Sequence, residues 1–450
     1  MTFTRGHFAL LFIDRYDRLT PKRLAMKRKR TAPAHSARTK DTDPDSPDRP
    51  IPVSSALIQP DRLRASVAVT LVLAVAIRWW AFDVTYFRSD ELVYTHYASR
   101  ISEAGISQFR ALAEAYASNP SLWAFPNPLR VLYILLTALS CRVAGACSGT
   151  SVAAVSLLSG IALVLLTLVM AWRMFGERVA LLSGLLIAFS PLQLALSRRA
   201  WQDGFFSLTV LLALWAFWER SRSPRREWDV LLGGALLTAL LTKESALIFL
   251  LGFLGVLLYT RLSDNVPIAR STLWALLLPL PLAIAVILAL IPDPSLLIRV
   301  YRGWLAAVEK GEFAIAYSRG PWFRYLIDFL LLSPPTTLLA IGYYFMSSAE
   351  QGDRFLGRST LILFAVFSLL TLKNVRYVSF LDIPIRILAA LTLTAFSQRP
   401  PFAWAGWRVA VVGVTLLAAY DLSMFHAIFV SGGIYDPVTE NLAKAEHLIP

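Results

Sequence analysis

The sequence predicts an all-α polytopic membrane protein with about 11 transmembrane helices, and three observations lead to this fold class. Of the 450 residues, 56% are hydrophobic and only 16% are charged, whereas soluble domains usually carry about a quarter charged residues. Apolar runs follow one another along the chain, and several approach the ~20 residues that a helix needs to cross a bilayer. These runs are rich in Leu and Ala and lack the alternation of a membrane barrel.

The N-terminal segment, residues 1–64, is predicted to be a disordered, basic, cytoplasmic tail. It holds 14 of the 44 Lys and Arg and has too little apolar surface to fold on its own. Because basic segments stay on the cytoplasmic side of a membrane, the tail places the N-terminus in the cytoplasm. Met26, which precedes Lys27-Arg28-Lys29-Arg30, is a second candidate beside Met1 for the start of the chain.

The transmembrane domain is predicted at residues 65–430, and its first span covers about 65–82. The first external loop then covers residues 83–146. Within it, the sequence shows helical patterning at 90–104 and again at 108–117, which predicts juxtamembrane helices that lie outside the bilayer core.

The apolar stretch 128–146 decides the topology of everything after it. It carries Arg130 and Arg142, and if it crossed the membrane, the later Arg-rich loops would face outward, against the positive-inside bias. We therefore predict a juxtamembrane or re-entrant helix here, which leaves a short external C-terminal tail at residues 431–450. The loops that become cytoplasmic are Arg173–Arg178, Glu219–Glu227, Arg261–Arg270, Ser347–Arg358 and Gln398–Arg408.

Later spans follow the apolar runs, with examples at 152–172, 179–196 and 272–291. The span predicted at 325–346 contains Ser333-Pro334-Pro335, and these prolines are expected to interrupt its helix. Trp201 and several other Trp residues near span ends suit anchors at the membrane surface, with stacking against a sugar as the alternative.

Charge and composition exclude several classes of function. The net charge of +14 comes from loops and the tail, where basic residues attract anionic membrane lipid, so no nucleic-acid partner is expected. Two Cys and five scattered His are too few for a disulfide framework or a zinc site. The sequence requires no cofactor, although a divalent metal would be compatible with its carboxylates.

Polar residues without a topological role collect on the predicted external face. Each has an ordinary explanation by itself: acids favour the first turn of a helix, Asp203 could pair with Arg198 or Arg199, and Lys243-Glu244 could be a neutralised pair. Together they suit transfer of a group from a lipid phosphate to a hydroxyl, because a carboxylate accepts the hydroxyl proton and cations hold the leaving phosphate. The set is Asp90, Glu91, Asp203, Lys243, Glu244, Arg319, Arg324, Lys373 and Arg376.

Six short motifs, in order along about residues 65–400, resemble those of the GT-C glycosyltransferases, in particular the protein O-mannosyltransferases and the aminoarabinose transferase of lipid A. Relatives often have Lys where Asn127 stands and commonly Gly where Glu244 stands, so this chain departs from their pattern there. The motifs are Asp90-Glu91 with Tyr94, Phe125-Pro126-Asn127-Pro128-Leu129, Ser197-Arg198-Arg199-Ala200 with Asp203, Leu241-Thr242-Lys243, Ser318-Arg319-Gly320-Pro321-Trp322, and Lys373-Asn374-Val375-Arg376-Tyr377 with Pro384.

The resemblance implies an inverting glycosyltransferase, and the short, Arg-rich loops suit a bacterial plasma (inner) membrane. It would move a sugar from a polyprenyl-phosphate-linked donor to a glycolipid, polysaccharide or protein acceptor outside the cytoplasm. It implies Asp90 as general base, with Glu91 and Asp203 shaping the site. The cations implied to bind the donor phosphate are Lys243, Arg319, Lys373 and Arg376, and the further site candidates are Tyr94, Arg130 and Tyr377.

The main alternative is a polytopic membrane transporter or lipid flippase without transferase activity. Such a protein is expected to bury charges in the middle of its spans and to show two halves with matching hydropathy, whereas most charges here lie at span ends. A structural or assembly membrane protein is a second alternative, and it gives no reason for acidic and basic residues to gather on one face.

Overall fold

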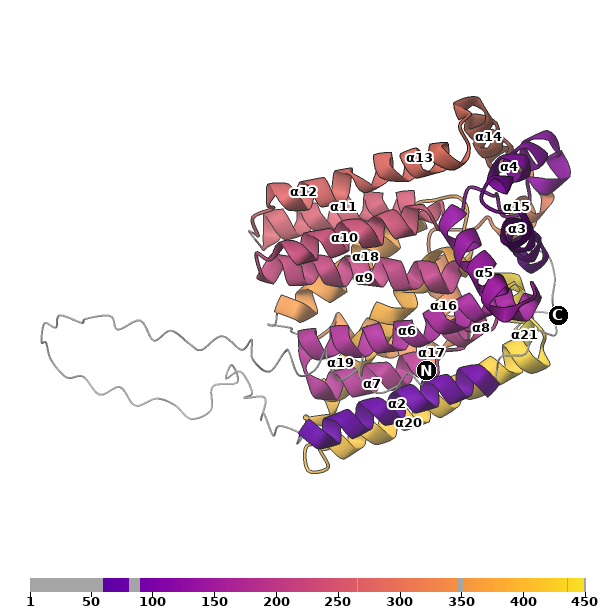
Figure 1. The fold of residues 1–450 in the computed structure, drawn as a ribbon. Coiled ribbons are helices and arrows are strands. Elements are labelled where there is room, and N and C mark those ends of the chain that lie inside the picture. The colour runs from indigo at the N-terminus through magenta and orange to yellow at the C-terminus, as the bar shows by residue number, and fades with distance from the viewer. Residues whose placement is uncertain (1–59, 81–89, 265, 347–350, 435, 449–450) are drawn as a thin grey trace, which may run out of the picture. The chain divides into compact units, whose positions relative to one another are not determined.

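The structure is a computed structural model, and within the part of the chain that it describes the helices run side by side in a bundle (Figure 1). Arg319 and Leu372 form an isolated β-bridge. Most of the predicted N-terminal tail, residues 1–59, lies outside the described residues. The described ranges are 60–80, 90–264, 266–346, 351–434 and 436–448.

The bundle is built from long helices and from pairs of shorter ones that continue each other. Short loops join many of them, so that several neighbours in sequence also pack against each other. The helices are α2 (Pro60–Trp80), α6 (Gly149–Phe175), α7 (Glu177–Ala188), α8 (Pro191–Ser197), α9 (Asp203–Arg222), α10 (Arg226–Leu240), α11 (Ser245–Ser263), α12 (Arg270–Leu277), α13 (Pro279–Leu290), α16 (Arg324–Leu332), α17 (Pro334–Tyr343), α18 (Gln351–Ser368), α19 (Asp382–Ser397) and α20 (Trp407–Phe425), with η2 (Val375–Leu381) before α19 and η3 (His426–Ser431) after α20.

Short helices gather at one end of the bundle, which we call the capped end (at the right in Figure 1). The helices predicted at 90–104 and 108–117 are confirmed by α3 and α4, whose bounds agree within one residue. The helices of the capped end are α3 (Asp90–Ala104), α4 (Gln108–Ser118), η1 (Pro120–Leu122), α5 (Val131–Ala144), α14 (Pro294–Lys310), α15 (Glu312–Tyr317) and α21 (Thr439–Ala445).

The opposite end of the bundle, which we call the basic end, holds the Arg-rich loops that are predicted to be cytoplasmic. Arg173 pairs with Glu219 at 2.8 Å, which joins the end of α6 to the end of α9. Arg358 pairs with Asp264 at 3.3 Å, which joins α18 to the end of α11. Of the predicted loop 347–358, residues 347–350 lie outside the described residues.

The chain is an integral membrane protein. Five helical segments among the described residues are long and apolar enough to cross a membrane, and six if α7 and α8 count as one broken span. The count of about 11 spans therefore stays a prediction. The five segments are Gly149–Phe175, Ser245–Ser263, Arg270–Leu290, Val375–Ser397 and Trp407–Ser431.

Two predicted spans are interrupted. The run 179–196, predicted as one span, is divided into α7 and α8, which meet at 58°. Ser190 causes this break, because its side chain caps the new helix by accepting a hydrogen bond from Gln193 N, and Pro191 follows at the first helical position. The interruption predicted at Ser333 is confirmed, since α16 ends at Leu332 and α17 begins at Pro334.

The stretch 128–146 forms α5, which has 14 residues. At 1.5 Å per residue it is about 21 Å long, shorter than the ~30 Å hydrocarbon core, and this length supports the prediction that it does not cross the membrane. Gly145 ends the helix with φ of +75°, a conformation that favours glycine. A disulfide between Cys141 and Cys147 then ties the end of α5 to the start of α6.

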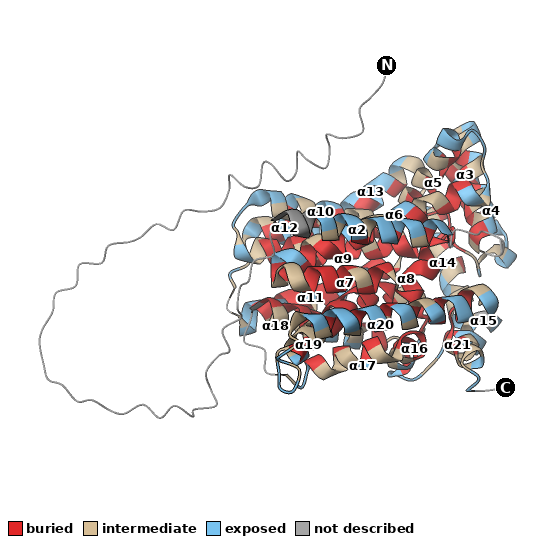
Figure 2. Ribbon diagram, turned by 90° about the horizontal axis from the view of Figure 1, so that it is seen from below, coloured by how far each residue is buried: buried red, intermediate tan, exposed pale blue. Residues whose placement is uncertain are grey.

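Burial follows the pattern of a bundle in lipid. Figure 2 shows buried positions along α7 and α9 and exposed positions along α2 and α20. Apolar side chains are exposed on the outer helices, among them Val72 (67%), Leu282 (48%) and Leu416 (67%). In water such surfaces would be unfavourable, whereas lipid tails cover them at no cost.

Candidate functional site

Four charged side chains from four separate elements meet at the capped end. The carboxylate of Asp203 accepts hydrogen bonds from Lys243 Nζ (2.5 Å) and from Nη2 (3.0 Å) and Nε (3.2 Å) of Arg376. Arg376 Nη2 also donates to Oδ2 of Asp90 at 3.0 Å. We call Asp90, Asp203, Lys243 and Arg376 the central cluster, and it contains two negative and two positive charges.

Local sequence explains the backbone positions of these four residues. Asp90 and Asp203 each lie in the first turn of a helix, where the helix dipole favours a carboxylate. Lys243 lies in the turn that reverses the chain between α10 and α11. Arg376 lies near the start of η2, which is capped by Asn374, since the Asn374 side chain accepts a hydrogen bond from Arg376 N at 3.0 Å.

The members of the central cluster differ in accessibility. The Asp203 side chain is fully buried and that of Lys243 is 3% exposed, whereas those of Arg376 and Asp90 are 11% and 20% exposed. A buried charge is tolerated only when it is paired and hydrogen-bonded, and Asp203 meets this condition through both cations. Asp90 is the most accessible member and is therefore the one best placed to meet a substrate.

Aromatic rings surround the two cations. The Arg376 guanidinium lies 4.1 Å from the ring centre of Trp201, and Lys243 Nζ lies 4.9 Å from that of Tyr377 and 5.6 Å from that of Phe206. Such contacts stabilise a cation with little access to water. Trp201 is 1% exposed, so its prediction as an anchor at the membrane surface is wrong: its ring is buried against Arg376.

A second polar cluster lies beside the first and centres on Glu244. Arg130 donates three hydrogen bonds of 2.8–3.1 Å to the Glu244 carboxylate, and Asn127 Nδ2 donates a fourth at 2.6 Å. Arg130 also donates to the Tyr94 hydroxyl (2.7 Å), which donates to Oε1 of Gln202 (2.5 Å). Because Gln202 precedes Asp203 and Glu244 follows Lys243, the two clusters share their backbone segments.

This second cluster changes the interpretation of two predicted features. Lys243 and Glu244 do not neutralise each other, because their side chains reach different partners, Asp203 and Arg130. Asn127 and Glu244, at which the chain departs from the GT-C pattern, contact each other. Arg130, a candidate for the site, has its guanidinium engaged by Glu244 in this structure.

Glu91, the other acid of the first motif, is fully buried. It pairs with Arg199 at 3.2 Å and accepts a hydrogen bond from the backbone N of Ala200 at 3.3 Å. Glu91 therefore ties the start of α3 to the segment that precedes Asp203, and the explanation of these acids as a solvated helix start does not hold for it.

The remaining predicted cations lie close by but outside the central cluster. The Arg319 guanidinium donates to the Glu309 carbonyl at 2.8 Å, and Lys373 Nζ donates to the Leu370 carbonyl. Among the described contacts, neither side chain pairs with Asp90 or Asp203. The two residues lie near each other, because the backbone at Lys373 donates to the Ser318 carbonyl at 2.5 Å.

Three residues near the site were not predicted, namely Gln202, Asn374 and Asp436. Asn374 Nδ2 donates to Asp436 Oδ1 at 3.1 Å. Burial raises the pKa of Asp436 above its usual value, although nearby Arg376 and the Asn374 hydrogen bond oppose this rise. Asp436 lies in the segment that was predicted to be a tail, and no motif marks it in the sequence.

The described residues contain no group of three or more His, Cys, Asp or Glu that could hold a metal ion. In the central cluster the two carboxylates bind Lys243 and Arg376 instead.

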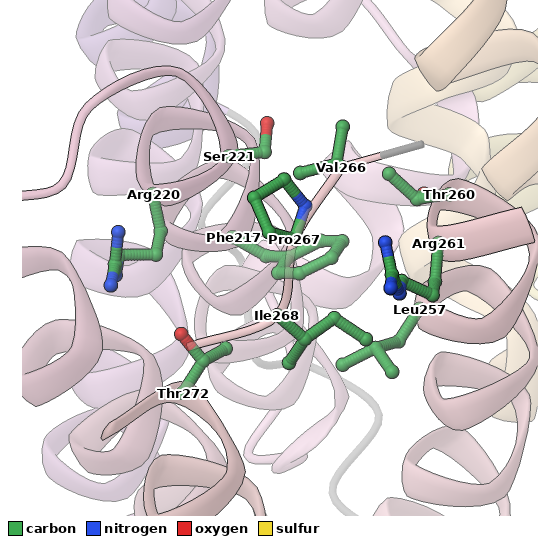
Figure 3. A pocket seen from close by; sticks show the side chains of 10 residues that line it. All are labelled: Phe217, Arg220, Ser221, Leu257, Thr260, Arg261, Val266, Pro267, Ile268 and Thr272. Carbon is green, nitrogen blue, oxygen red and sulfur yellow. The ribbon is translucent and has the colours of Figure 1, made fainter. Parts of the chain in front are cut away.

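A small pocket lies at the basic end. Figure 3 shows Arg220 and Arg261 on either side of it, with Phe217 and Pro267 in its wall. Phe217 lies 14 residues after Asp203 on α9, which is about 21 Å along the helix axis. The pocket is thus remote from the central cluster.

Comparison with known proteins supports the fold that the sequence suggests. Residues 127–289, just over a third of the chain, match the family model described as dolichyl-phosphate-mannose-protein mannosyltransferase. This stretch contains Asp203 and Lys243 but neither Asp90 nor Arg376. No curated protein sequence matches the chain.

Two solved structures of ArnT from Cupriavidus metallidurans are similar to the chain at 17% identity. The apo structure has a TM-score of 0.50, and the match covers 82% of this chain and 66% of that one. The structure bound to undecaprenyl phosphate has a TM-score of 0.51, with 85% and 77% covered. The Archaeoglobus fulgidus oligosaccharyltransferase tethered with an acceptor peptide has a TM-score of 0.54 at 13% identity, with 82% and 55% covered.

The chain thus spans about two thirds of the apo ArnT chain and just over half of the oligosaccharyltransferase. At these identities the likeness concerns the arrangement of helices. The all-α architecture, the short helices at the capped end and the solved structures agree with the resemblance seen in the motifs. The chain has the GT-C fold of membrane glycosyltransferases.

Proposed function

We propose that the protein is a glycosyltransferase that moves a sugar from a polyprenyl-phosphate-linked donor to an acceptor hydroxyl outside the cytoplasm. One observation carries this proposal: residues from four distant segments form a single cluster of two carboxylates and two cations. A carboxylate can take the acceptor proton, and cations can hold the phosphate that leaves. The GT-C fold and the ArnT structure with undecaprenyl phosphate support a lipid-phosphate donor.

We assign the role of general base to Asp90 and a holding role to Asp203. Asp203 is fully buried between Lys243 and Arg376, and both of its carboxylate oxygens accept hydrogen bonds from these cations. Asp90 is 20% exposed and shares Arg376 with Asp203. A donor phosphate that takes Arg376 as a partner would also release Asp90, and binding of the donor would thereby free the base.

The reaction is a single displacement that inverts the anomeric carbon. The acceptor oxygen forms the new bond to that carbon while the bond from the carbon to the phosphate oxygen breaks. The acceptor proton passes to the Asp90 carboxylate, and the electron pair leaves with the phosphate oxygen. Lys243 and Arg376, the cations of the central cluster, would hold this phosphate, and Arg319 and Lys373 lie on the adjacent loops.

The side of the membrane that the site faces follows from the basic loops at the opposite end of the bundle. Basic loops stay in the cytoplasm, so the capped end, with the central cluster, faces the other side of the membrane. We place the protein in a bacterial plasma membrane with a cytoplasmic N-terminus. The acceptor is then a glycolipid, a polysaccharide or a protein, and the oligosaccharyltransferase structure with a tethered acceptor peptide is one example of a protein-derived acceptor in this fold.

A transporter would need charges inside its spans, and one such group exists. Arg386 pairs with Asp382 (2.9 Å) and with Asp421, and these acids accept hydrogen bonds from Ser190 (2.6 Å) and Ser333 (2.5 Å). The three charged residues are at most 4% exposed. A group that is closed off and fully paired in this way joins α19 to α8, α17 and α20, and it offers no path for a solute.

The proposal is tested by incubating the purified protein with a polyprenyl-phosphate sugar and measuring free lipid phosphate. Asp90→Asn should reduce its release at least about 100-fold, because general-base catalysis contributes about 10²–10⁴-fold. Asp264→Asn is the matched control, since Asp264 is similarly exposed (18%) and also pairs with an Arg, but at the basic end. Near-normal release by Asp90→Asn would remove the base assignment, and no release by the wild type would favour a transporter.

A further inference from the structure

The segment after the last long helix contacts both of the loops that carry late cations. We call residues 436–439 the clasp; helix α21 begins at its last residue. The first loop, residues 317–320, carries Arg319. The second, residues 371–376, carries Lys373 and Arg376.

At its first residue the clasp contacts the second loop through Asn374. Asp436 Oδ1 accepts a hydrogen bond from Asn374 Nδ2 at 3.1 Å, and Asn374 Oδ1 accepts one from Arg376 N at 3.0 Å. Asn374 is 5% exposed, so its amide has few other partners within reach. The Asn374 side chain caps η2, and this cap fixes the backbone position of Arg376.

At its last residue the clasp contacts the first loop through Arg324. Thr439 Oγ1 accepts a hydrogen bond from Arg324 Nε at 2.6 Å and donates one to Asp328 Oδ1 at 2.5 Å. The other two guanidinium nitrogens of Arg324 donate to the carbonyls of Arg319 and Tyr317, both at 2.5 Å. Arg324 therefore uses every one of its nitrogens to join Thr439 to the backbone of the first loop.

The two loops are also joined to each other. Lys373 N donates to the Ser318 carbonyl at 2.5 Å, and Arg319 and Leu372 form the isolated β-bridge. A displacement of one loop would therefore displace the other. The clasp contacts both loops. It is held in place by packing, since Val438 of the clasp and Leu442 of α21 are 1% and 0% exposed.

We propose that the clasp is a positioning element of the site, which holds both basic loops in place for the donor phosphate. This inference rests on the proposed function. Asp436 and Thr439 do not contact the reacting atoms; they act through Asn374 and Arg324. The consequence is specific: loss of the clasp contacts should weaken binding of the phosphate more than it slows the chemical step.

The test compares Thr439→Val, Thr439→Ser and Asp436→Ala in the transfer assay. Valine keeps the shape of threonine but loses the hydroxyl, so Arg324 Nε and Asp328 are left without this partner. We expect the donor KM to rise about tenfold in Thr439→Val and in Asp436→Ala, which corresponds to the loss of one hydrogen bond to a charged group. The kcat should change less than threefold, and Thr439→Ser should behave like the wild type.

Glu440→Gln provides the matched control, because Glu440 follows the clasp directly but forms an exposed pair with Lys444 at 2.9 Å. It should leave KM unchanged. A role confined to anchoring α21 would lower the melting temperature of Thr439→Val and leave the donor KM within twofold of the wild type, and that result would overturn the inference. Asp436→Ala gives an independent answer if Thr439→Val does not fold.

Binding of a polyprenyl phosphate without sugar, followed by Trp fluorescence, separates this inference from the proposed function. If the wild type transfers sugar and binds the lipid phosphate but the clasp variants do both equally well, only the role of the clasp is refuted. If the wild type neither transfers sugar nor binds the lipid phosphate, the proposed function fails and the inference fails with it.

Discussion

The pair Arg130–Glu244 allows a direct test of how this site is held together. Glu244 accepts three hydrogen bonds from Arg130 and one from Asn127, and both charged side chains are 11% exposed. Arg130→Ala leaves a nearly buried carboxylate with Asn127 alone. Glu244→Ala leaves the guanidinium with the Tyr94 hydroxyl as its described partner.

The expected magnitude follows from burial. Removing one member of a buried ion pair costs about 3–5 kcal/mol, whereas replacing both members with apolar residues of similar volume is often neutral. Because each side chain retains some access to water, we take the lower limit and expect each single alanine variant to lose about 3 kcal/mol. The double variant Arg130→Ala/Glu244→Ala should lose less than the sum of the two single losses, because neither charge is then left without its partner.

Unfolding of the detergent-purified protein, followed by fluorescence of its 13 Trp residues, measures the stability of each variant. The matched control is Arg110→Ala, because Arg110 and Glu114 form an exposed pair at 2.9 Å with 56% and 52% exposure, and exposed pairs contribute little to stability. If the losses of the two single variants add in the double variant, the two side chains do not depend on each other and the argument fails.

The same pair predicts that the stabilities of the wild type and of Arg130→Ala depend on pH in opposite directions. Burial acts to raise the pKa of Glu244, but the Arg130 charge and its hydrogen bonds outweigh burial, and the pKa lies below its usual value of 4.5. In the wild type this contribution to stability is therefore complete above pH 4.5 and is lost as the pH falls. In Arg130→Ala, the backbone and Asn127 hydrogen bonds alone oppose burial. The Glu244 pKa should then rise, and acidification from pH 7 to 5 should raise the melting temperature instead.

Two further predictions concern other parts of the capped end. Arg376→Lys should lower kcat more than tenfold in the transfer assay, because an ammonium cannot reproduce the planar fork that joins both carboxylates and stacks on Trp201; activity within threefold would show that charge alone suffices. Cys141→Ser should lower stability by roughly 2 kcal/mol, as expected for a loop closed by a disulfide at a separation of 6 residues. Unfolding of the wild type with and without reductant checks this value, and equal melting temperatures would contradict it.

Sequence patterns predicted those parts of the fold that depend on local physics. The bounds of α3 and α4 follow from helical patterning, the interruption at Ser333 follows from proline chemistry, and the prediction that α5 does not span follows from the charges of the later loops. The break at Ser190 was missed, because a Ser-Pro pair within an apolar run also occurs in continuous spans. There the polar cap competes with helix continuation, and the surrounding residues decide the outcome.

Partners of the charged residues could not be predicted in the same way. Asp203 has Arg198 and Arg199 close in sequence, but it pairs with Lys243 and Arg376, which are 40 and 173 positions away. Adjacent residues on a helix or in a turn point in different directions, so Lys243 and Glu244 belong to different clusters. Proximity in sequence is therefore a poor guide to ion pairs at the ends of a bundle, where many loops meet.

Charge balance explains why a phosphate can bind where every cation of the central cluster already has a partner. The cluster is neutral, and a sugar linked through a phosphodiester brings one negative charge. In the proposed transfer, the leaving phosphate would gain a second negative charge, while Asp90 would become neutral by taking the acceptor proton. The cations thus lose one competing carboxylate as the phosphate becomes more negative, so their interaction with it is stronger in the transition state than in the bound donor, which is the condition for catalysis.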